Sequence, residues 1–189
     1  MARGRHAGRQ TRVVFERLET DRLALRAITM HDIDLLVALD ADPAVMRFIN
    51  GGRPSTRAEV EEKVRGAIGH RWVAFERATD EFVGWFAMRP SAQLPAERYL
   101  GYRLRRPAWG KGRAAEGSRA LITEAFTRGT ERILAQTMTV NTASRRVMER
   151  CGMRYLRTFF EEWDEPIEGG DLGDVEYELT KAAWEHRPA

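Results

Sequence analysis

The chain has 189 residues, a formal net charge of +3 and a single cysteine. Hydrophobic residues make up 43% and charged residues 31%, a balance typical of one soluble globular domain with a sizeable core. No apolar run is long enough to span a bilayer, no apolar signal segment follows the basic N-terminus, and one cysteine excludes an internal disulfide. We therefore expect a cytoplasmic protein without a membrane partner, and so small a net charge does not require nucleic acid as a partner.

The two ends of the chain carry no clear pattern of a folded element. Residues 1–12 are rich in Arg, Gly and polar residues and predict a disordered basic tail. A basic arm that touches nucleic acid is the alternative, and we favour the solvated tail. The residues from Lys181 onward are also interpreted as a tail. We expect a single domain over residues 13–184, followed by a tail over residues 185–189.

The first third of the chain predicts one strand and two amphipathic helices. Alternating apolar residues around residues 22–26 indicate the strand. Thr29 and Thr56 each precede an acid by three residues, which is the pairing of a capping box at the start of a helix. Pro43 is expected to end the first helix, and a short turn or helix over residues 44–48 separates it from the second.

The rest of the chain alternates strands with helices. The predicted elements are strands over residues 71–77, 81–88 and 98–105, a helix over 113–129, a strand over 132–139, a helix over 141–150, and strands over 153–160 and 174–180. The first three strands form an antiparallel meander, and Gly101 inside the third hints at a bulge or at the close approach of another group. The strands before and after the long helix are expected to be parallel, because a crossover helix joins them. The fold class is therefore α+β.

A basic, glycine-bearing loop connects the third strand of the meander to the long helix. Because the loop opens a helix, its backbone N–H groups lack helical partners and lie at the positive end of the helix dipole. Gly110 and Gly112 allow the backbone to approach a ligand closely, since no Cβ stands in the way. Four cationic side chains surround them: Arg105, Arg106, Lys111 and Arg113. The loop predicts a phosphate or pyrophosphate site, and the alternative is a glycine turn with a solvated basic rim.

Two common phosphate-binding loops do not fit this segment. A Walker A loop needs Ser or Thr after its Gly-Lys pair, but Gly112 follows Lys111 here. A dinucleotide fingerprint is met literally by Gly110, Gly112 and Ala115, yet that fingerprint belongs early in a chain and needs a carboxylate at the end of the next strand. That strand ends at Val140 without a carboxylate.

Two stretches of the chain carry a resemblance to a known family. The sequence Trp-Gly-Lys-Gly-Arg-Ala at residues 109–114 follows a strand, and residues 141–153 contain an Asn-x-x-Ser pattern that ends in Gly-Met. Together they resemble the coenzyme A pyrophosphate loop and the Asn-x-x-Ser…Gly-Phe segment of the GNAT acetyltransferase superfamily, in its RimJ/RimL-type N-acetyltransferase branch. Residues 18–23 and 174–184 fit the same branch, so the resemblance covers roughly residues 16–184.

The resemblance implies a three-layer fold, with a mixed, mostly antiparallel central sheet flanked by helices and a splayed parallel strand pair. It implies that acetyl-CoA is the co-substrate, that an amine attacks the thioester directly in a ternary complex, and that no metal is needed. The exposed backbone of the splayed strand would bond the pantetheine arm and polarise the thioester carbonyl. The residues expected to bind the cofactor are Tyr102, Arg103, Leu104, Arg105, Trp109, Gly110, Lys111, Gly112, Arg113, Ala114, Ala115 and Asn141, with Arg106 as a further phosphate contact.

The resemblance also assigns catalytic roles. Ser144 would protonate or hydrogen-bond the departing thiolate, while Asn141 would meet the pantetheine or the substrate and could also cap its helix. Some members carry a Tyr seven residues after this Asn, where this chain has Met148. The base that deprotonates the amine is left open between Tyr99 and Glu97 acting through water, because Tyr99 stands where the branch often has Glu.

The acceptor is the least determined part of the reaction. The acidic stretch over residues 161–174 could attract a cationic amine, although a solvated acidic loop is the favoured interpretation. Trp163 and Trp85 are candidates to wall a substrate cleft, with core packing favoured for Trp85. We expect a primary amine as acceptor, in a peptide N-terminus, a polyamine or an aminoglycoside-like small molecule, and a homodimer stays open. Cys151 is expected to be a buried residue at a helix end with no nucleophilic role.

Two other functions remain as alternatives. A catalytically weak acyl-CoA-binding regulatory module on the same fold is motivated by Tyr99, which replaces the usual acid. A nucleic-acid-binding protein would use the basic N-terminal tail. The resemblance favours an N-acetyltransferase over both.

Overall fold

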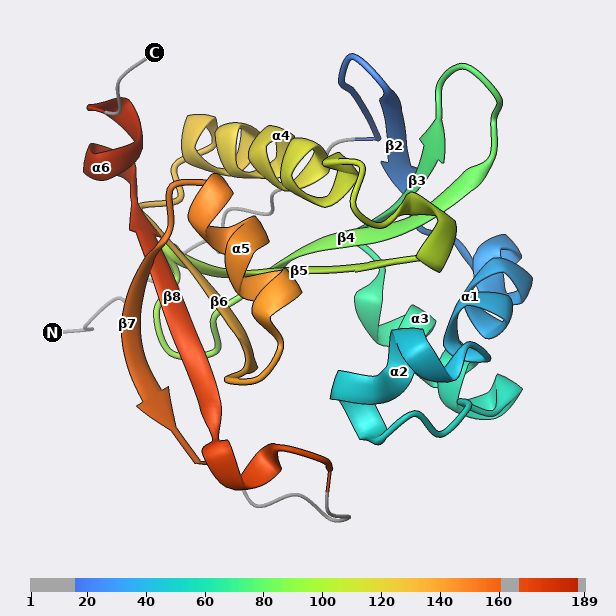
Figure 1. Cartoon of the computed structure of the whole chain (residues 1–189). Coiled ribbons are helices and arrows are strands. Elements are labelled where there is room, and N and C mark those ends of the chain that lie inside the picture. Colours follow the sequence, from blue (N-terminus) through green and yellow to red (C-terminus); the bar gives the residue numbers. More distant parts are fainter. Residues whose placement is uncertain (1–15, 161–166, 187–189) are drawn as a thin grey trace, which may run out of the picture.

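Figure 1 shows the computed structural model, which describes residues 16–160 and 167–186. The predicted basic tail over residues 1–12 lies outside the described residues. So do Trp163 and the part of the acidic stretch over residues 161–166. The predictions for those segments therefore stay predictions.

Eight strands form one sheet, in the order β1-β2-β3-β4-β5-β6-β8-β7. The strands are β1 (Arg17–Glu19), β2 (Leu23–Ala27), β3 (Arg71–Glu76), β4 (Phe82–Pro90), β5 (Glu97–Leu104), β6 (Arg132–Met138), β7 (Arg154–Phe159) and β8 (Asp174–Thr180). Every neighbouring pair is antiparallel except β5 and β6, which are parallel. This mixed, mostly antiparallel sheet confirms the predicted α+β class and the crossover that joins β5 to β6.

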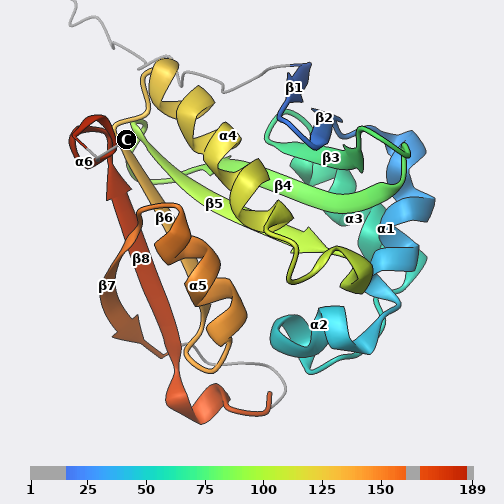
Figure 2. The ribbon, with the colours of Figure 1, turned by 45° about the horizontal axis from the view of Figure 1, so that its top comes forward.

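Helices cover both faces of this sheet, which makes three layers (Figures 1 and 2). The helices are α1 (Ile33–Asp40), α2 (Pro43–Asn50), α3 (Arg57–Ala67), α4 (Arg113–Thr127), α5 (Thr142–Arg150) and α6 (Lys181–Glu185). On β3, Trp72 belongs to the apolar cluster that includes α4 and α5, whereas Val73 belongs to the cluster formed with α1, α2 and α3. Successive side chains of a strand point to opposite faces, so the two clusters lie on opposite sides of the sheet.

The helix ends follow the predicted signals in most places. Thr56 and Glu59 form a capping box, in which each backbone N–H donates to the other side chain, over 2.6 and 3.3 Å. Pro43 begins α2 rather than closing α1, which has already ended. The prediction of a tail directly after β8 is wrong, because those residues form α6. Its Trp184 is 8% exposed and packs against Phe126, with ring centroids 6.1 Å apart.

The parallel pair β5–β6 opens into a wedge, visible in Figure 2. Its register joins three residues of each strand and ends at Tyr99 and Leu134. Beyond that point, residues 100–104 of β5 pair with β4 alone among the described strands. Gly101 is not a bulge, because it pairs with Ala87 within an unbroken register. The wedge is the splayed pair that the resemblance implied.

A glycine lets α4 lie close on the sheet beside this wedge. A Cβ at Gly117 would stand 2.4 Å from Cζ of Phe86, a fully buried ring on β4. Because real Cβ atoms do not approach a neighbour so closely, no other residue fits there without a shift of the helix or the ring. This contact positions the N-terminus of α4, and with it the basic loop, relative to β5.

Candidate active site

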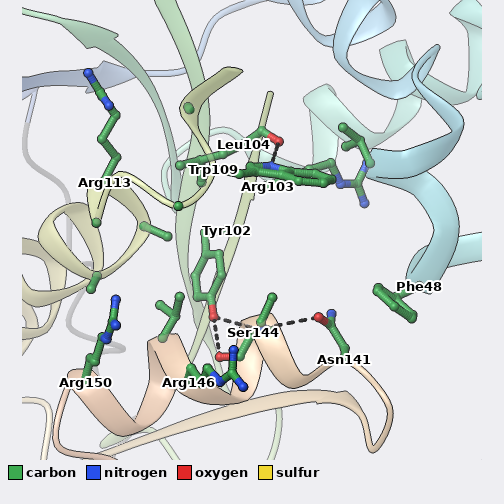
Figure 3. A pocket seen from close by; sticks show the side chains of 18 of the residues that line it. Phe48, Tyr102, Arg103, Leu104, Trp109, Arg113, Asn141, Ser144, Arg146 and Arg150 are labelled. Atoms are coloured by element: carbon green, nitrogen blue, oxygen red, sulfur yellow. Dashed lines mark hydrogen bonds between the residues drawn. The ribbon is translucent and has the colours of Figure 1, made fainter. Parts of the chain in front are cut away.

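Two adjoining cavities occupy the wedge. The first has a volume of about 410 Å³ and lies between the basic loop, β5 and α5 (Figure 3). The second has a volume of about 320 Å³ and is lined by β4, β5, β6 and the ends of β7 and β8. The residues that line both cavities are Phe48, Ile49, Tyr102, Arg103, Asn141 and Ser144. These shared residues mark the place where a molecule in one cavity would meet a molecule in the other.

The basic loop presents backbone N–H groups to the first cavity. Gly110 and Gly112 have φ angles of 70° and 77°, in the left-handed region that favours glycine. Gly112 caps α4, and the first helical hydrogen bond runs from the N–H of Glu116 to the carbonyl of Gly112 over 3.0 Å. The N–H groups of residues 113–115 therefore precede the helical ladder. Trp109 closes the loop by donating its Nε1–H to the last carbonyl of β5 over 2.7 Å.

The structure separates the cationic residues of this loop from one another. Arg113 lines the first cavity and also forms an ion pair with Glu76 on β3. Arg105 donates to the carbonyl of a β4 residue over 3.0 Å, and Arg106 forms an ion pair over 2.7 Å with Asp42, which caps the start of α2. Neither of these two, nor Lys111, lines either cavity. The side chains of Arg105 and Arg106 tie the loop to β4 and to the start of α2.

Two arginines of α5, which the sequence pattern did not indicate as site residues, also line the first cavity. Arg146 and Arg150 are exposed on α5 and face the cavity from the side opposite the loop (Figure 3). They lie four residues apart, so they share one face of the helix. Arg103 and Arg113 also line the first cavity, and Figure 3 shows the side chain of Arg113, which pairs with Glu76, pointing away from Arg146 and Arg150. The i, i+4 spacing on an expected helix was a signal that could have identified them.

A pair of hydroxyl groups lies at the boundary of the two cavities. The Tyr102 hydroxyl is 2.9 Å from Oγ of Ser144 and donates to the Ser144 carbonyl over 3.1 Å. Burial raises the pKa of Tyr102, so its hydroxyl keeps its proton at neutral pH. Asn141 caps α5 by accepting from the N–H of Ser144 over 3.2 Å. Met148 is buried at 2% exposure and offers no proton.

The two residues expected to act as the base have different surroundings. Tyr99 lines the second cavity, and burial together with nearby Glu176 and Glu97 raises its pKa. Glu97 is 6% exposed, pairs with Arg132 over 3.2 Å and lines neither cavity. Among the described residues, the one carboxylate that lines either cavity is Asp174 at the start of β8, at 7% exposure. The sequence pattern places Asp174 in the acidic stretch and at the start of the predicted strand over residues 174–180, but gives it no catalytic role.

The second cavity has an aromatic and cationic wall. Trp85 lines this cavity and also packs against the apolar cluster under α1–α3, so core packing accounts for only part of its surroundings. The guanidinium groups of Arg71 and Arg103 lie 4.2 and 5.3 Å from the Trp85 ring. Burial, with Arg103 nearby, lowers the pKa of Arg71 to about 10. Arg103 forms an ion pair with Asp40 over 2.6 Å.

The remaining candidate groups lie away from both cavities. Cys151 is 2% exposed, its Sγ lies 3.7 Å from the Ala115 carbonyl, and burial raises its pKa to about 11. Within residues 16–160 and 167–186, no three His, Cys, Asp or Glu side chains gather in a way that could hold a metal ion. None of the helices in that part of the chain has the length and apolar character needed to cross a membrane.

Comparison with known proteins agrees with this geometry. The sequence profile of the acetyltransferase (GNAT) domain matches residues 22–154. The chain is 34% identical to the FsC-acetyl coenzyme A-N(2)-transacetylase of Aspergillus fumigatus over 184 residues, which cover 88% of this chain and 77% of the relative.

Two of the solved structures that share the fold serve as examples. One is RimL, a ribosomal L7/L12 α-N-protein acetyltransferase in complex with coenzyme A, with a TM-score of 0.73 and 22% identity over 87% of this chain and 98% of the other. The other is the Vibrio cholerae spermidine N-acetyltransferase in complex with CoA and spermine, with a TM-score of 0.75 and 17% identity over 88% of this chain and 100% of the other. With the profile match and the 34% identical relative, they show that this chain belongs to the GNAT acetyltransferase family and is an acyl-CoA-dependent N-acetyltransferase.

Proposed function

We propose that the protein transfers an acetyl group from acetyl-CoA to a primary amine within a ternary complex, with coenzyme A in the first cavity and the acceptor in the second. The observation that carries this proposal is the meeting of the two cavities at Tyr102, Asn141 and Ser144, where β5 leaves β6. A thioester lying there would be accessible to an acceptor without any covalent enzyme intermediate.

The first cavity suits the chemistry of coenzyme A. Residues 100–104 of β5 have backbone groups on the wedge side that can bond the amides of a pantetheine arm and polarise a thioester carbonyl. The N–H groups of residues 113–115 suit a pyrophosphate at the start of α4. Arg113, Arg146 and Arg150 are the side chains we assign to the phosphates.

Acetyl-CoA supplies an activated acetyl group as its thioester. Residues of this chain accept one proton from the acceptor ammonium and donate one to the leaving sulfur. We assign Asp174, directly or through a water molecule, to take a proton from the acceptor ammonium, because it is a carboxylate at the wall of the acceptor cavity. The neutral amine then attacks the carbonyl carbon, so that a C–N bond forms and the C–S bond breaks, and the nitrogen releases its second proton to solvent as the amide forms. We assign Ser144 to hydrogen-bond or protonate the leaving sulfur, and Tyr102, which regains its proton from solvent, to return a proton to Ser144 through their 2.9 Å contact.

The two earlier base candidates receive other roles in this proposal. Tyr99 has a raised pKa, which makes a tyrosinate base unfavourable, so we assign it to hydrogen bonding with the acceptor. Glu97 pairs with Arg132 of β6, and we assign it to holding the closed end of the wedge.

Measurement of coenzyme A release with acetyl-CoA and a panel of peptides, polyamines, aminoglycosides and amino acids tests this function. We expect turnover with at least one amine. Asp174→Asn should lower kcat most at low pH, where the acceptor amine is most fully protonated, and Ser144→Ala should lower kcat with little change in the affinity for coenzyme A. Tight acetyl-CoA binding without turnover on any amine would instead support a regulatory acyl-CoA-binding module.

A further inference from the structure

The floor of the second cavity is a row of cross-strand pairs on one face of β4 and β5. The register pairs Trp85 with Arg103, Ala87 with Gly101, and Arg89 with Tyr99. Paired residues of an antiparallel sheet point to the same face, and alternate residues of each strand share that face. Of the small central pair, Gly101 lines the cavity while Ala87 is buried beside it, and larger side chains rise at both ends.

Arginine dominates this floor at both ends. Arg89 is exposed, lies 5.8 Å from the Tyr99 ring and lines the cavity. No carboxylate of the described residues lies within ion-pair distance of Arg89. Arg103 lines the other end, where Asp40 neutralises it, but its buried Nε–H has no acceptor among the described residues.

A third arginine adds charge beside this floor. Arg71 on β3 pairs with Ala87 in the register and so shares the floor's face of the sheet; it stacks against Trp85, and its Nε–H also lacks an acceptor among the described residues. Of the groups near it, Arg89 and Arg103 disfavour its positive charge and only Asp40 favours that charge. Of these three guanidinium groups, only that of Arg103 forms an ion pair with a described carboxylate, and such a wall favours a negatively charged partner.

Three further acids lie near the cavity, Asp174 and Glu176 on β8 and Glu97 on β5. Asp174 lines the cavity from β8. Glu176 is bonded to Arg157 over 2.7 Å and to Gln136 over 2.8 Å, and Glu97 is bonded to Arg132. Those two glutamates are therefore balanced by their own partners, whereas the floor keeps an excess of positive charge. The cavity is therefore positively charged at its arginine floor and carries a carboxylate, Asp174, where β8 lines it.

We infer that the acceptor is an amine that also carries a carboxylate, as an amino acid does, and that Arg89 binds this carboxylate. This inference rests on the proposed function, because it places the acceptor in the second cavity. Arg89 and Arg103 each lie two residues along the strand from the central pair, which is roughly 7 Å. A carboxylate held at Arg89 leaves the amine over the small floor, beside the wedge and Asp174. A polyamine would instead bring a second cation against the arginines.

The test compares three acceptors that differ only in the carboxyl position: L-lysine, L-lysinamide and cadaverine. We expect kcat/KM for L-lysine to exceed that for the other two by at least about tenfold, since one charge-assisted pair contributes roughly that factor. Arg89→Ala should raise KM for L-lysine about tenfold, with little change in kcat and no change for L-lysinamide. Arg89→Lys should restore part of the loss. Arg47→Ala is the matched control, because Arg47 is also exposed but pairs with Glu168 and lines neither cavity.

A second measurement separates this inference from the proposed function. Calorimetric titration of L-lysine into the protein saturated with coenzyme A reports acceptor binding without chemistry. Binding that weakens in Arg89→Ala but not in Arg47→Ala supports the carboxylate site even if no amine is acetylated. Equal binding and equal turnover of L-lysine and L-lysinamide, or a preference for cadaverine, would overturn the inference while leaving N-acetyl transfer intact.

Discussion

Replacing Gly112 by Asp tests whether the start of α4 holds a pyrophosphate. Gly112 caps α4 with a φ of 77°. Asp at this position would add a carboxylate directly before residues 113–115, whose N–H groups we assign to phosphate binding. We expect Gly112→Asp to weaken coenzyme A binding strongly, and Gly112→Asn to serve as its uncharged match in size and shape.

Comparing the Asp and Asn variants separates the backbone strain of the substitution from the effect of its negative charge. Any side chain at a left-handed position costs about 1–2 kcal/mol. A Cβ there would meet only Nη2 of Arg22, at 3.4 Å, and this nitrogen already pairs with Glu116 over 2.5 Å. Asp and Asn share that strain, so the difference between them is one negative charge. At roughly 6 Å from one phosphate charge, with an effective dielectric constant between about 20 and 80, repulsion amounts to about 0.7–3 kcal/mol, or roughly 3- to 100-fold in affinity.

Calorimetric titration of coenzyme A at two ionic strengths measures this difference. The gap between the Asp and Asn variants should narrow at high salt, because salt screens the repulsion. Circular dichroism of both variants establishes that they are folded. If folded Gly112→Asp binds coenzyme A as tightly as Gly112→Asn, the pyrophosphate does not lie at the start of α4 and the assignment of the first cavity fails.

Three further predictions concern the hydroxyl pair, the α4 contact and the buried thiol. Tyr102→Phe should lower kcat about 10- to 100-fold in coenzyme A release while coenzyme A affinity stays within about threefold, because it removes the proton supply to Ser144; unchanged kcat would refute the relay. Gly117→Ala should lower the free energy of unfolding in urea by about 1–3 kcal/mol, because its Cβ would overlap the Phe86 ring; unchanged stability would show that α4 is not tightly seated. Burial raises the Cys151 pKa from 9.0 to about 11, so the unfolded chain loses this proton first and stability should fall by roughly 2–3 kcal/mol as pH rises from 9 to 11. Cys151→Ala should remove this part of the pH dependence, and an unaltered profile in that variant would contradict it.

Local pattern in the sequence determined much of the fold and the start of the site. The alternation of strands and helices, the capping pair Thr56 and Glu59 and the crossover between β5 and β6 all follow from residues close together in the chain. Gly110 and Gly112 indicated an anion site because a helix N-terminus and a glycine act over a few residues. The exception was α6. This helix is too short to show a periodicity of its own, and it is stabilised by the packing of Trp184 against α4.

Tertiary structure alone decided which side chains share the wedge. Tyr102 and Ser144 are 42 positions apart in the chain, and Asp174 comes from the last strand, so no local spacing indicated that they line adjoining cavities. Arg89 and Arg103 both lie on the floor of the second cavity, because the register of β4 and β5 aligns them on one face of the sheet. Side-chain burial and charge balance are properties of such long-range pairings, because a residue's neighbours across a sheet set its solvent access and its partners. The sequence alone therefore determined the fold class and predicted a phosphate loop, while the second cavity and its charges emerged only from the folded sheet.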